Sequence, residues 1–199
     1  MMEKENTWDV IKIIIHGRGG QGAVTASEII VEAAYLSGNF VDVHAYPSFG
    51  AERRGAPIQA YTKLSKSEKI WDRAQIEKPN IIIVLDETVL NQAIASSIEK
   101  EGIFLINSEK DPDYFRKKYN LSSDISIYVA DFSKMALEKG LIIEGVPVVN
   151  IPILGLLSKA LSELNLDDLK KVILKKMKSE VGKINIELME QGYNLVKVL

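Results

Sequence analysis

A glycine-rich turn comes directly after the first apolar run of the chain. Residues 10–15 form that run, and its continuous apolar character predicts a strand buried on both faces. Residues 23–37 carry apolar side chains at helical spacing and predict a helix. The turn between them consists of Gly17, Arg18, Gly19, Gly20, Gln21 and Gly22. A strand, a glycine turn and a helix in this order aim free backbone N–H groups at an anion, so the sequence predicts an α/β fold with a ligand site at a strand end.

Strands and helices alternate over most of the chain. Further strands are predicted at 40–46, 58–64, 81–85, 103–106 and 125–130. The segment 58–64 alternates apolar and polar side chains, which indicates a half-exposed strand at an edge or in an antiparallel pair. After residue 150 the pattern becomes helical, with helices predicted at 151–164, 167–178 and 183–198. We therefore expect one domain over 1–199, with a three-layer, Rossmann-like core and a mainly parallel sheet over 9–149, and a helical C-terminal part over 150–199.

The residue types that the chain lacks restrict its chemistry. There is no cysteine, which excludes disulfides, thiolate zinc sites and cysteine-ligated iron–sulfur clusters within this chain. Two histidines, His16 and His44, are too few for a histidine-rich metal site, so we expect no metal. The formal net charge of −2 gives no indication of nucleic-acid binding. Because no apolar run is long enough to span a membrane and residues 1–9 lack a signal-peptide pattern, we expect a cytoplasmic protein.

The turn has the G-x-G-x-x-G spacing of dinucleotide-binding folds, but two observations weaken that interpretation. Asp42, the acid that would hold the ribose, comes early in the strand 40–46 rather than at its end. Arg18 and Gln21 place polar side chains inside the turn. A P-loop is excluded, because no Lys-Ser or Lys-Thr pair follows the last glycine. A tight strand-to-helix turn without a ligand is the alternative.

A second polar cluster lies in the loop before residue 58. Glu52, Arg53 and Arg54 form it, and two interpretations are open. In the first, Glu52 pairs with an arginine and the loop only shapes a bend. In the second, the arginine forks bind an anionic group of a ligand or of a partner protein. Asp86 and Glu87 follow a predicted strand, where open α/β sheets bind ligands, although Asp86 is more simply explained as a helix cap.

Two of these motifs together resemble a known family. The heptapeptide His-Gly-Arg-Gly-Gly-Gln-Gly at 16–22 and the segment from Tyr to Pro at 46–57 resemble the gamma subunit of the 2-oxoacid:ferredoxin oxidoreductases. The resemblance continues with Leu-Asp-Glu-Thr at 85–88, Pro-Ile-Leu-Gly at 152–155 and Gln-Gly-Tyr at 191–193. It covers essentially the whole chain. It is strongest for the pyruvate synthase branch, followed by the 2-ketoisovalerate branch.

The resemblance implies a multisubunit enzyme that decarboxylates a 2-oxoacid oxidatively. Coenzyme A takes up the acyl group, carbon dioxide leaves, and ferredoxin accepts the electrons. In that family thiamine diphosphate with Mg²⁺ lies between the alpha and beta subunits, and [4Fe–4S] clusters lie on the beta and delta subunits. The gamma subunit carries none of these groups. We therefore expect this chain to bind no redox cofactor, to assemble with alpha, beta and delta subunits, and to be inactive alone.

The resemblance also suggests what the polar motifs do. We expect no catalytic residue in this chain, and instead a role in forming the coenzyme A site. Candidates for the phosphates of coenzyme A are the glycine turn with Arg18, together with Arg53 and Arg54. Glu52 is expected at a subunit interface, and the two arginines of its loop are also interface candidates. Other functions left open are a stand-alone NAD(P)-dependent reductase and a non-catalytic nucleotide-sensing module.

Overall fold

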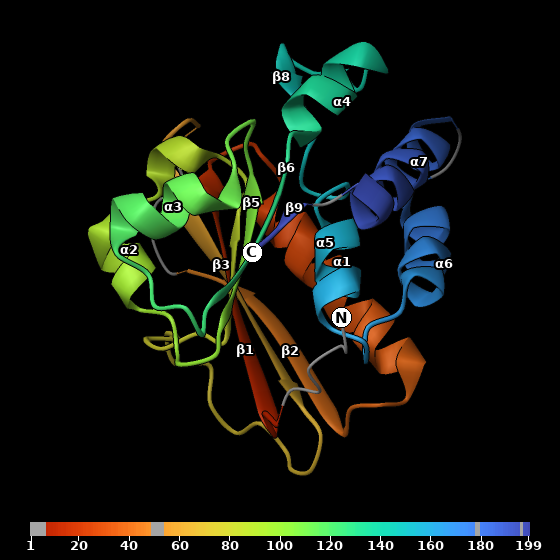
Figure 1. Cartoon of the computed structure of the whole chain (residues 1–199). Helices are drawn as coiled ribbons and strands as arrows, with labels where there is room; N and C mark the ends of the chain where they lie inside the picture. The colour runs from red at the N-terminus through yellow and green to blue at the C-terminus, as the bar shows by residue number, and fades with distance from the viewer. Residues whose placement is uncertain (1–6, 49–53, 178–179, 196) are drawn as a thin grey trace.

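A mixed seven-stranded sheet forms the centre of the molecule (Figure 1). The computed structural model describes residues 7–48, 54–177, 180–195 and 197–199. The strands lie in the order β2-β3-β1-β4-β5-β6-β9. Their bounds are β1 (Val10–Arg18), β2 (Asp42–Pro47), β3 (Pro57–Ser65), β4 (Ile81–Val84), β5 (Ile103–Asn107), β6 (Ser126–Ala130) and β9 (Lys197–Val198). Strands β1, β4, β5 and β6 are parallel, whereas β3 pairs antiparallel with β1 and β2, and β9 pairs antiparallel with β6.

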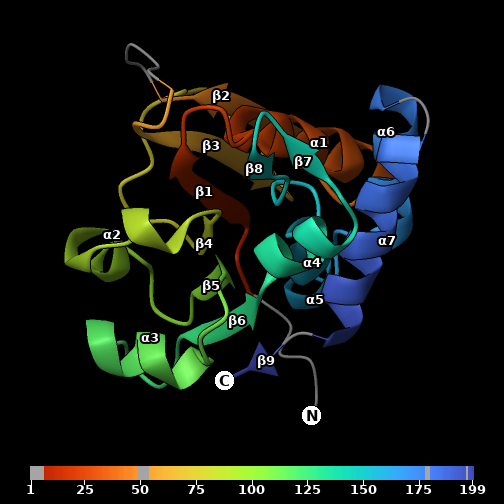
Figure 2. The same cartoon turned by 90° about the horizontal axis from the view of Figure 1, so that it is seen from above.

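Helices cover both faces of this sheet (Figure 2). On one side lie α1 (Ala23–Ser37), α5 (Leu154–Ala160), α6 (Leu166–Lys176) and α7 (Glu180–Leu195). On the other side lie α2 (Gln92–Ser96) and α3 (Pro112–Tyr119). The helix α4 (Phe132–Glu138) and a small hairpin, β7 (Ile142–Ile143) with β8 (Val146–Pro147), project from one end of the sheet (Figure 1). The three-layer α/β prediction is confirmed.

The alternation of side chains along the strands explains the two layers. Ile11, Ile13 and Ile15 of β1 pack with α1, whereas Ile82 and Val84 of β4 pack with α2 and α3. All five side chains are fully buried. Burying each such side chain stabilises the fold by about 1.5–3 kcal/mol. The continuous apolar runs of the sequence therefore reflect strands that are covered on both faces, as predicted.

The helices after residue 150 complete the same core. Leu154 of α5, Leu169 of α6 and Met189 of α7 are fully buried and belong to one cluster with Ile30 of α1. The C-terminal part is therefore packed on the sheet layer rather than detached from it. The helix predicted at 183–198 is displaced by three residues, because α7 begins at Glu180 and ends at Leu195, and β9 then adds an antiparallel strand next to β6.

Strand β3 differs in part from its prediction. The antiparallel alternative is confirmed, since the strand pairs antiparallel with β2 and β1, but most of the strand is buried rather than half-exposed. Thr62 and Lys63 are buried as well as the apolar residues. The segment 66–80 covers Lys63, because it lies over the face of β3 that α1 does not cover, whereas Thr62 lies on the α1 face together with Ala60 and Leu64. None of the helices in the described part of the chain has the length and apolar character that a bilayer crossing needs.

Candidate functional site

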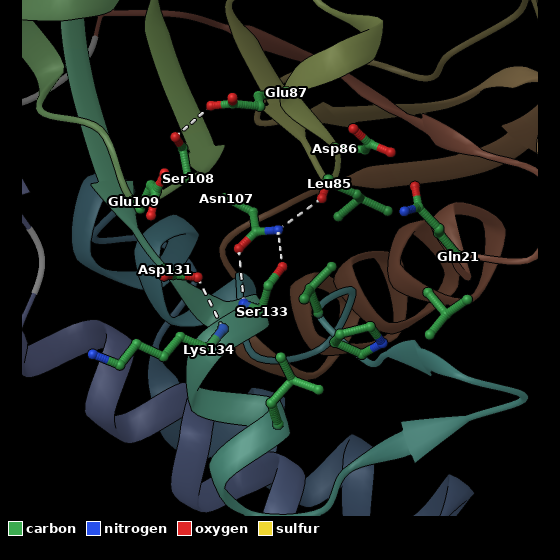
Figure 3. A pocket seen from close by; sticks show the side chains of 14 residues that line it. Gln21, Leu85, Asp86, Glu87, Asn107, Ser108, Glu109, Asp131, Ser133 and Lys134 are labelled. Carbon is green, nitrogen blue, oxygen red and sulfur yellow. Dashed lines mark hydrogen bonds between the residues drawn. The ribbon is translucent and has the colours of Figure 1, made fainter.

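A crevice opens where the strand order reverses. From β1 the chain passes through α1 to β2 and β3 on one side of β1, and then to β4 on the other side. Ligands of open α/β sheets bind at such a point, beyond the carboxyl ends of the strands. A cavity of about 470 Å³ lies there, bounded by Gln21 of the turn, Asp86 after β4, Asn107 at the end of β5, and Val146 of the hairpin (Figure 3).

The glycine turn needs glycine for its shape. Gly20 and Gly22 have φ angles of +95° and +76°, a region that other residues rarely adopt. A Cβ atom at Gly22 would also lie 2.4 Å from Nδ2 of Asn150. That amide donates a hydrogen bond of 3.1 Å to the carbonyl oxygen of Gly22. The turn is therefore fixed by its own backbone and by an asparagine from the C-terminal part.

The turn is also joined to the loop that follows β2. The Gly19 N–H donates to the carbonyl of Ala56 at 2.9 Å, and the Gly55 N–H donates to the carbonyl of Gly19 at 3.0 Å. A backbone bridge pairs Gly19 with Arg54. The two motifs that stand apart in the sequence thus form one structure at the rim of the crevice.

Arg18 spans this structure with three hydrogen bonds. Its Nε donates to Oδ2 of Asp86 at 3.0 Å, its Nη1 to the carbonyl of Gly55 at 2.9 Å, and its Nη2 to the Thr88 hydroxyl at 2.7 Å. Through these hydrogen bonds the guanidinium group links the turn to the 54–57 loop and to the segment that follows β4. Burial acts to raise the pKa of Asp86, but hydrogen bonds from Thr88 and the charge of Arg18 outweigh it and hold that pKa below its usual value.

Arg54 is the more accessible arginine. Its side chain is 73% exposed and pairs with Glu144 of the β7–β8 hairpin, which is 62% exposed. Exposed pairs of this kind contribute only about 0–1 kcal/mol, so a ligand can replace either partner. Glu52 and Arg53, the other predicted residues of this loop, lie outside the described residues.

Asn107 lies at the floor of the crevice and forms hydrogen bonds with the residues around it (Figure 3). Its amide nitrogen donates to the carbonyl of Leu85 and to the Ser133 hydroxyl, both at 2.9 Å. Its amide oxygen accepts from the N–H groups of Phe132 at 2.9 Å and Ser133 at 3.2 Å. This buried side chain therefore joins the ends of β4 and β5 to the start of α4. No motif or periodic pattern in the sequence singles it out.

Carboxylates line the β4–β5 side of the crevice. Glu87 accepts a hydrogen bond of 2.5 Å from the Ser108 hydroxyl and pairs with Lys110. Burial acts to raise the pKa of Glu87, but the bonds from Lys110 and Ser108 hold it below its usual value. Glu109 and Asp131 line the same cavity. An anionic ligand group is therefore favoured near Arg18 and Arg54, which we call the arginine rim, and disfavoured on the carboxylate side.

His16 lies in β1 next to the turn. It is only 4% exposed, and its Nε2 has no hydrogen-bond partner. Burial lowers the pKa of His16 to about 4, so the ring is neutral near pH 7. Among the described residues, no cluster of three or more His, Cys, Asp or Glu side chains is arranged to hold a metal ion.

Comparison with known proteins gives one consistent family. Residues 12–195 match the model of the pyruvate ferredoxin/flavodoxin oxidoreductase family. The common subunit gamma of the pyruvate and ketoisovalerate oxidoreductases of Pyrococcus furiosus is 34% identical over 190 residues, covering 95% of this chain and 98% of that protein. The pyruvate synthase subunit PorC of Thermotoga maritima is 38% identical over 186 residues, covering 92% of each chain.

The fold agrees with this result. A crystal structure of the pyruvate oxidoreductase subunit PORC from Thermotoga maritima matches with a TM-score of 0.80 and 34% identity. The match covers 96% of this chain and 99% of that chain. The likeness therefore extends from the sheet to the C-terminal helices.

Proposed function

The chain belongs to the pyruvate ferredoxin/flavodoxin oxidoreductase family, and we propose that it serves as the gamma subunit of a pyruvate:ferredoxin oxidoreductase. Relatives that carry gamma-subunit or PorC names cover more than nine tenths of the chain, which supports this assignment. In the proposed enzyme, alpha, beta and delta subunits provide thiamine diphosphate, Mg²⁺ and the [4Fe–4S] clusters, and ferredoxin accepts the electrons. The role of this chain is then to build part of a ligand site and to hold partners.

We further propose that the arginine rim of the crevice receives the phosphates of coenzyme A. One observation carries this proposal: a turn with left-handed Gly20 and Gly22 lies between Arg18 and Arg54 at the point of strand-order reversal. Backbone N–H groups at the start of α1 and an arginine fork favour a phosphate there. Because Arg18 already has three internal partners, Arg54 is the residue that exchanges Glu144 for the ligand.

The reductase alternative is disfavoured by the position of Asp42. This residue begins β2, so it lies at the opposite end of the sheet from the glycine turn. Its carboxylate accepts from the Ile70 N–H at 2.8 Å and lies 3.3 Å from Nε2 of His44. It is therefore not available to hold a ribose next to the turn, as a dinucleotide site requires.

The coenzyme A proposal is tested by a pair of substitutions with opposite expected effects. In the assembled enzyme, Arg54→Ala should raise KM for coenzyme A about tenfold, because one charge-assisted hydrogen bond to phosphate is lost. Glu144→Gln should lower that KM, because it removes the carboxylate that competes for Arg54. KM for the 2-oxoacid should stay unchanged in both variants.

Lys183→Ala is the matched control, since Lys183 is 70% exposed and pairs with Glu180 on α7. Its steady-state parameters should equal those of the unmodified enzyme. Equal changes in KM for both substrates would contradict the proposal. Loss of the other subunits from the Arg54→Ala enzyme on gel filtration would also contradict it, and would favour an interface role for this loop.

A further inference from the structure

A segment without regular secondary structure covers one face of the sheet. Residues 66–80 connect β3 to β4 and contain no helix or strand. They lie over β2 and β3 on the face opposite α1, where Ile76 packs with Ile14, Tyr46 and Tyr61. This face thus differs from the rest of the sheet, which is covered by helices.

The segment is nevertheless fixed at several points. The Tyr46 hydroxyl donates to the carbonyl of Ala74 at 2.8 Å, and Nζ of Lys63 lies 2.6 Å from Oδ1 of Asp72. The Ile70 N–H donates to Asp42 at 2.8 Å. A segment that is held at both ends and in the middle presents its remaining side chains in a defined arrangement.

Two of those side chains make no hydrogen bond or ion pair with the residues that the structure describes. Trp71 is 87% exposed, the largest exposed fraction among the exposed large hydrophobic residues of the described chain. Arg73 follows two residues later, and among the described residues it has no hydrogen-bond or ion-pair partner. Tryptophan and arginine are the residues that most often dominate the binding energy of protein interfaces.

A small polar pocket lies beside Arg73. Its volume is about 150 Å³, and it is lined by Tyr46, Ser48, Gln59, Tyr61, Arg73 and Gln75. Cavities that hold small organic ligands usually measure about 300–1,000 Å³, so this pocket is of the size for one protein side chain. Its arginine and its amide and hydroxyl groups suit a carboxylate.

We propose that the face formed by Trp71, Arg73 and this pocket docks another subunit of the oxidoreductase. That subunit inserts an Asp or Glu carboxylate beside Arg73 and covers Trp71 with apolar side chains. This inference rests on the proposed multisubunit enzyme, but the pocket shares no residue with the crevice described above, so it is independent of the coenzyme A proposal.

A second copy of this chain fits the face less well. A two-fold contact would place the same patch against itself, and therefore Arg73 near its own copy. The carboxylate within the exposed stretch 71–75 is that of Asp72, and Lys63 already holds it. In such a contact Asp72 is not free to pair with Arg73 of the other copy, whereas a different subunit can supply a free carboxylate.

The test compares assembly of the complete enzyme with variant chains. Trp71→Ala and Arg73→Glu are each co-expressed with the other subunits, and the dissociation constant of the purified complex is measured by dilution and native mass spectrometry. We expect it to rise at least tenfold for each variant. Tyr35→Ala is the matched control, because Tyr35 is an aromatic side chain that is 74% exposed on α1, and it should leave the constant unchanged.

Thermal unfolding of each purified variant chain checks that the substitutions act on the interface and not on the fold. Dissociation constants within twofold of the unmodified complex would overturn the proposal. So would a dimer of the isolated chain that Trp71→Ala abolishes, since the face would then bind a second copy. KM for coenzyme A should not change in either variant, which separates this test from that of the arginine rim.

Discussion

Replacing Asn107 by alanine should lower the free energy of unfolding by about 4 kcal/mol. The substitution removes four hydrogen bonds and leaves the carbonyl of Leu85 and the N–H groups of Phe132 and Ser133 without this partner. These groups lie where three elements meet, and water replaces a buried partner poorly. Chemical denaturation of the isolated chain, followed by circular dichroism, measures the effect.

Two further variants sharpen this prediction. Asn39→Ala removes an exposed amide with a single bond of 2.8 Å to the carbonyl of Glu163, and should cost less than about 1 kcal/mol. Asn107→Asp keeps the acceptor oxygen but cannot donate to Leu85 when it is ionised. Folding should therefore raise the pKa of the introduced carboxyl group. The free energy of unfolding of this variant should then fall as the pH rises through that raised pKa. A loss for Asn107→Ala no larger than that for Asn39→Ala would contradict the assigned role.

Replacing Gly155 by alanine should lower the free energy of unfolding by about 3 kcal/mol. A Cβ atom at this position would lie 2.0 Å from the carbonyl oxygen of Met189 and 3.0 Å from the backbone nitrogen of Tyr193. The helices α5 and α7 must then separate, although both belong to the main core. The midpoint of thermal unfolding of the variant reports this loss.

Gly140→Ala provides the comparison. Gly140 has a φ angle of +67°, and a Cβ atom there would meet no atom within 4 Å. Its replacement should therefore cost only the backbone strain, about 1 kcal/mol. If the two alanine variants unfold at the same temperature, the close approach of α5 and α7 is not what requires glycine at Gly155.

Local patterns predicted the elements that position the crevice. The helix expected at 23–37 is α1, and the strand expected at 10–15 is the first part of β1, which continues to Arg18. Both follow from apolar periodicity and from the glycines between them. The helix that Asp86 was expected to cap is only a short turn. Asp86 caps a 3-10 turn, the chain becomes extended at Leu90, and α2 begins only at Gln92.

Sequence patterns alone did not predict the contacts between residues that are far apart in the chain. Arg18 and Asp86 are 68 positions apart, and the motif at Arg18 suggested a free phosphate ligand rather than an internal clamp. Asn107 and Asn150 are polar residues without a periodic pattern, so their roles depend on the three-dimensional neighbours. The strand β9 is likewise set by pairing with β6, since two residues carry no strand signal of their own.

The measurement that tests the assigned function most directly is anaerobic purification of the native chain with whatever it binds. The eluate is assayed for reduction of a viologen dye by pyruvate, with and without coenzyme A. We expect the chain to elute with thiamine diphosphate-containing and iron–sulfur subunits, and dye reduction to require both pyruvate and coenzyme A. A chain that elutes alone and binds NADH or NADPH tightly would contradict the gamma-subunit assignment and would favour the reductase alternative.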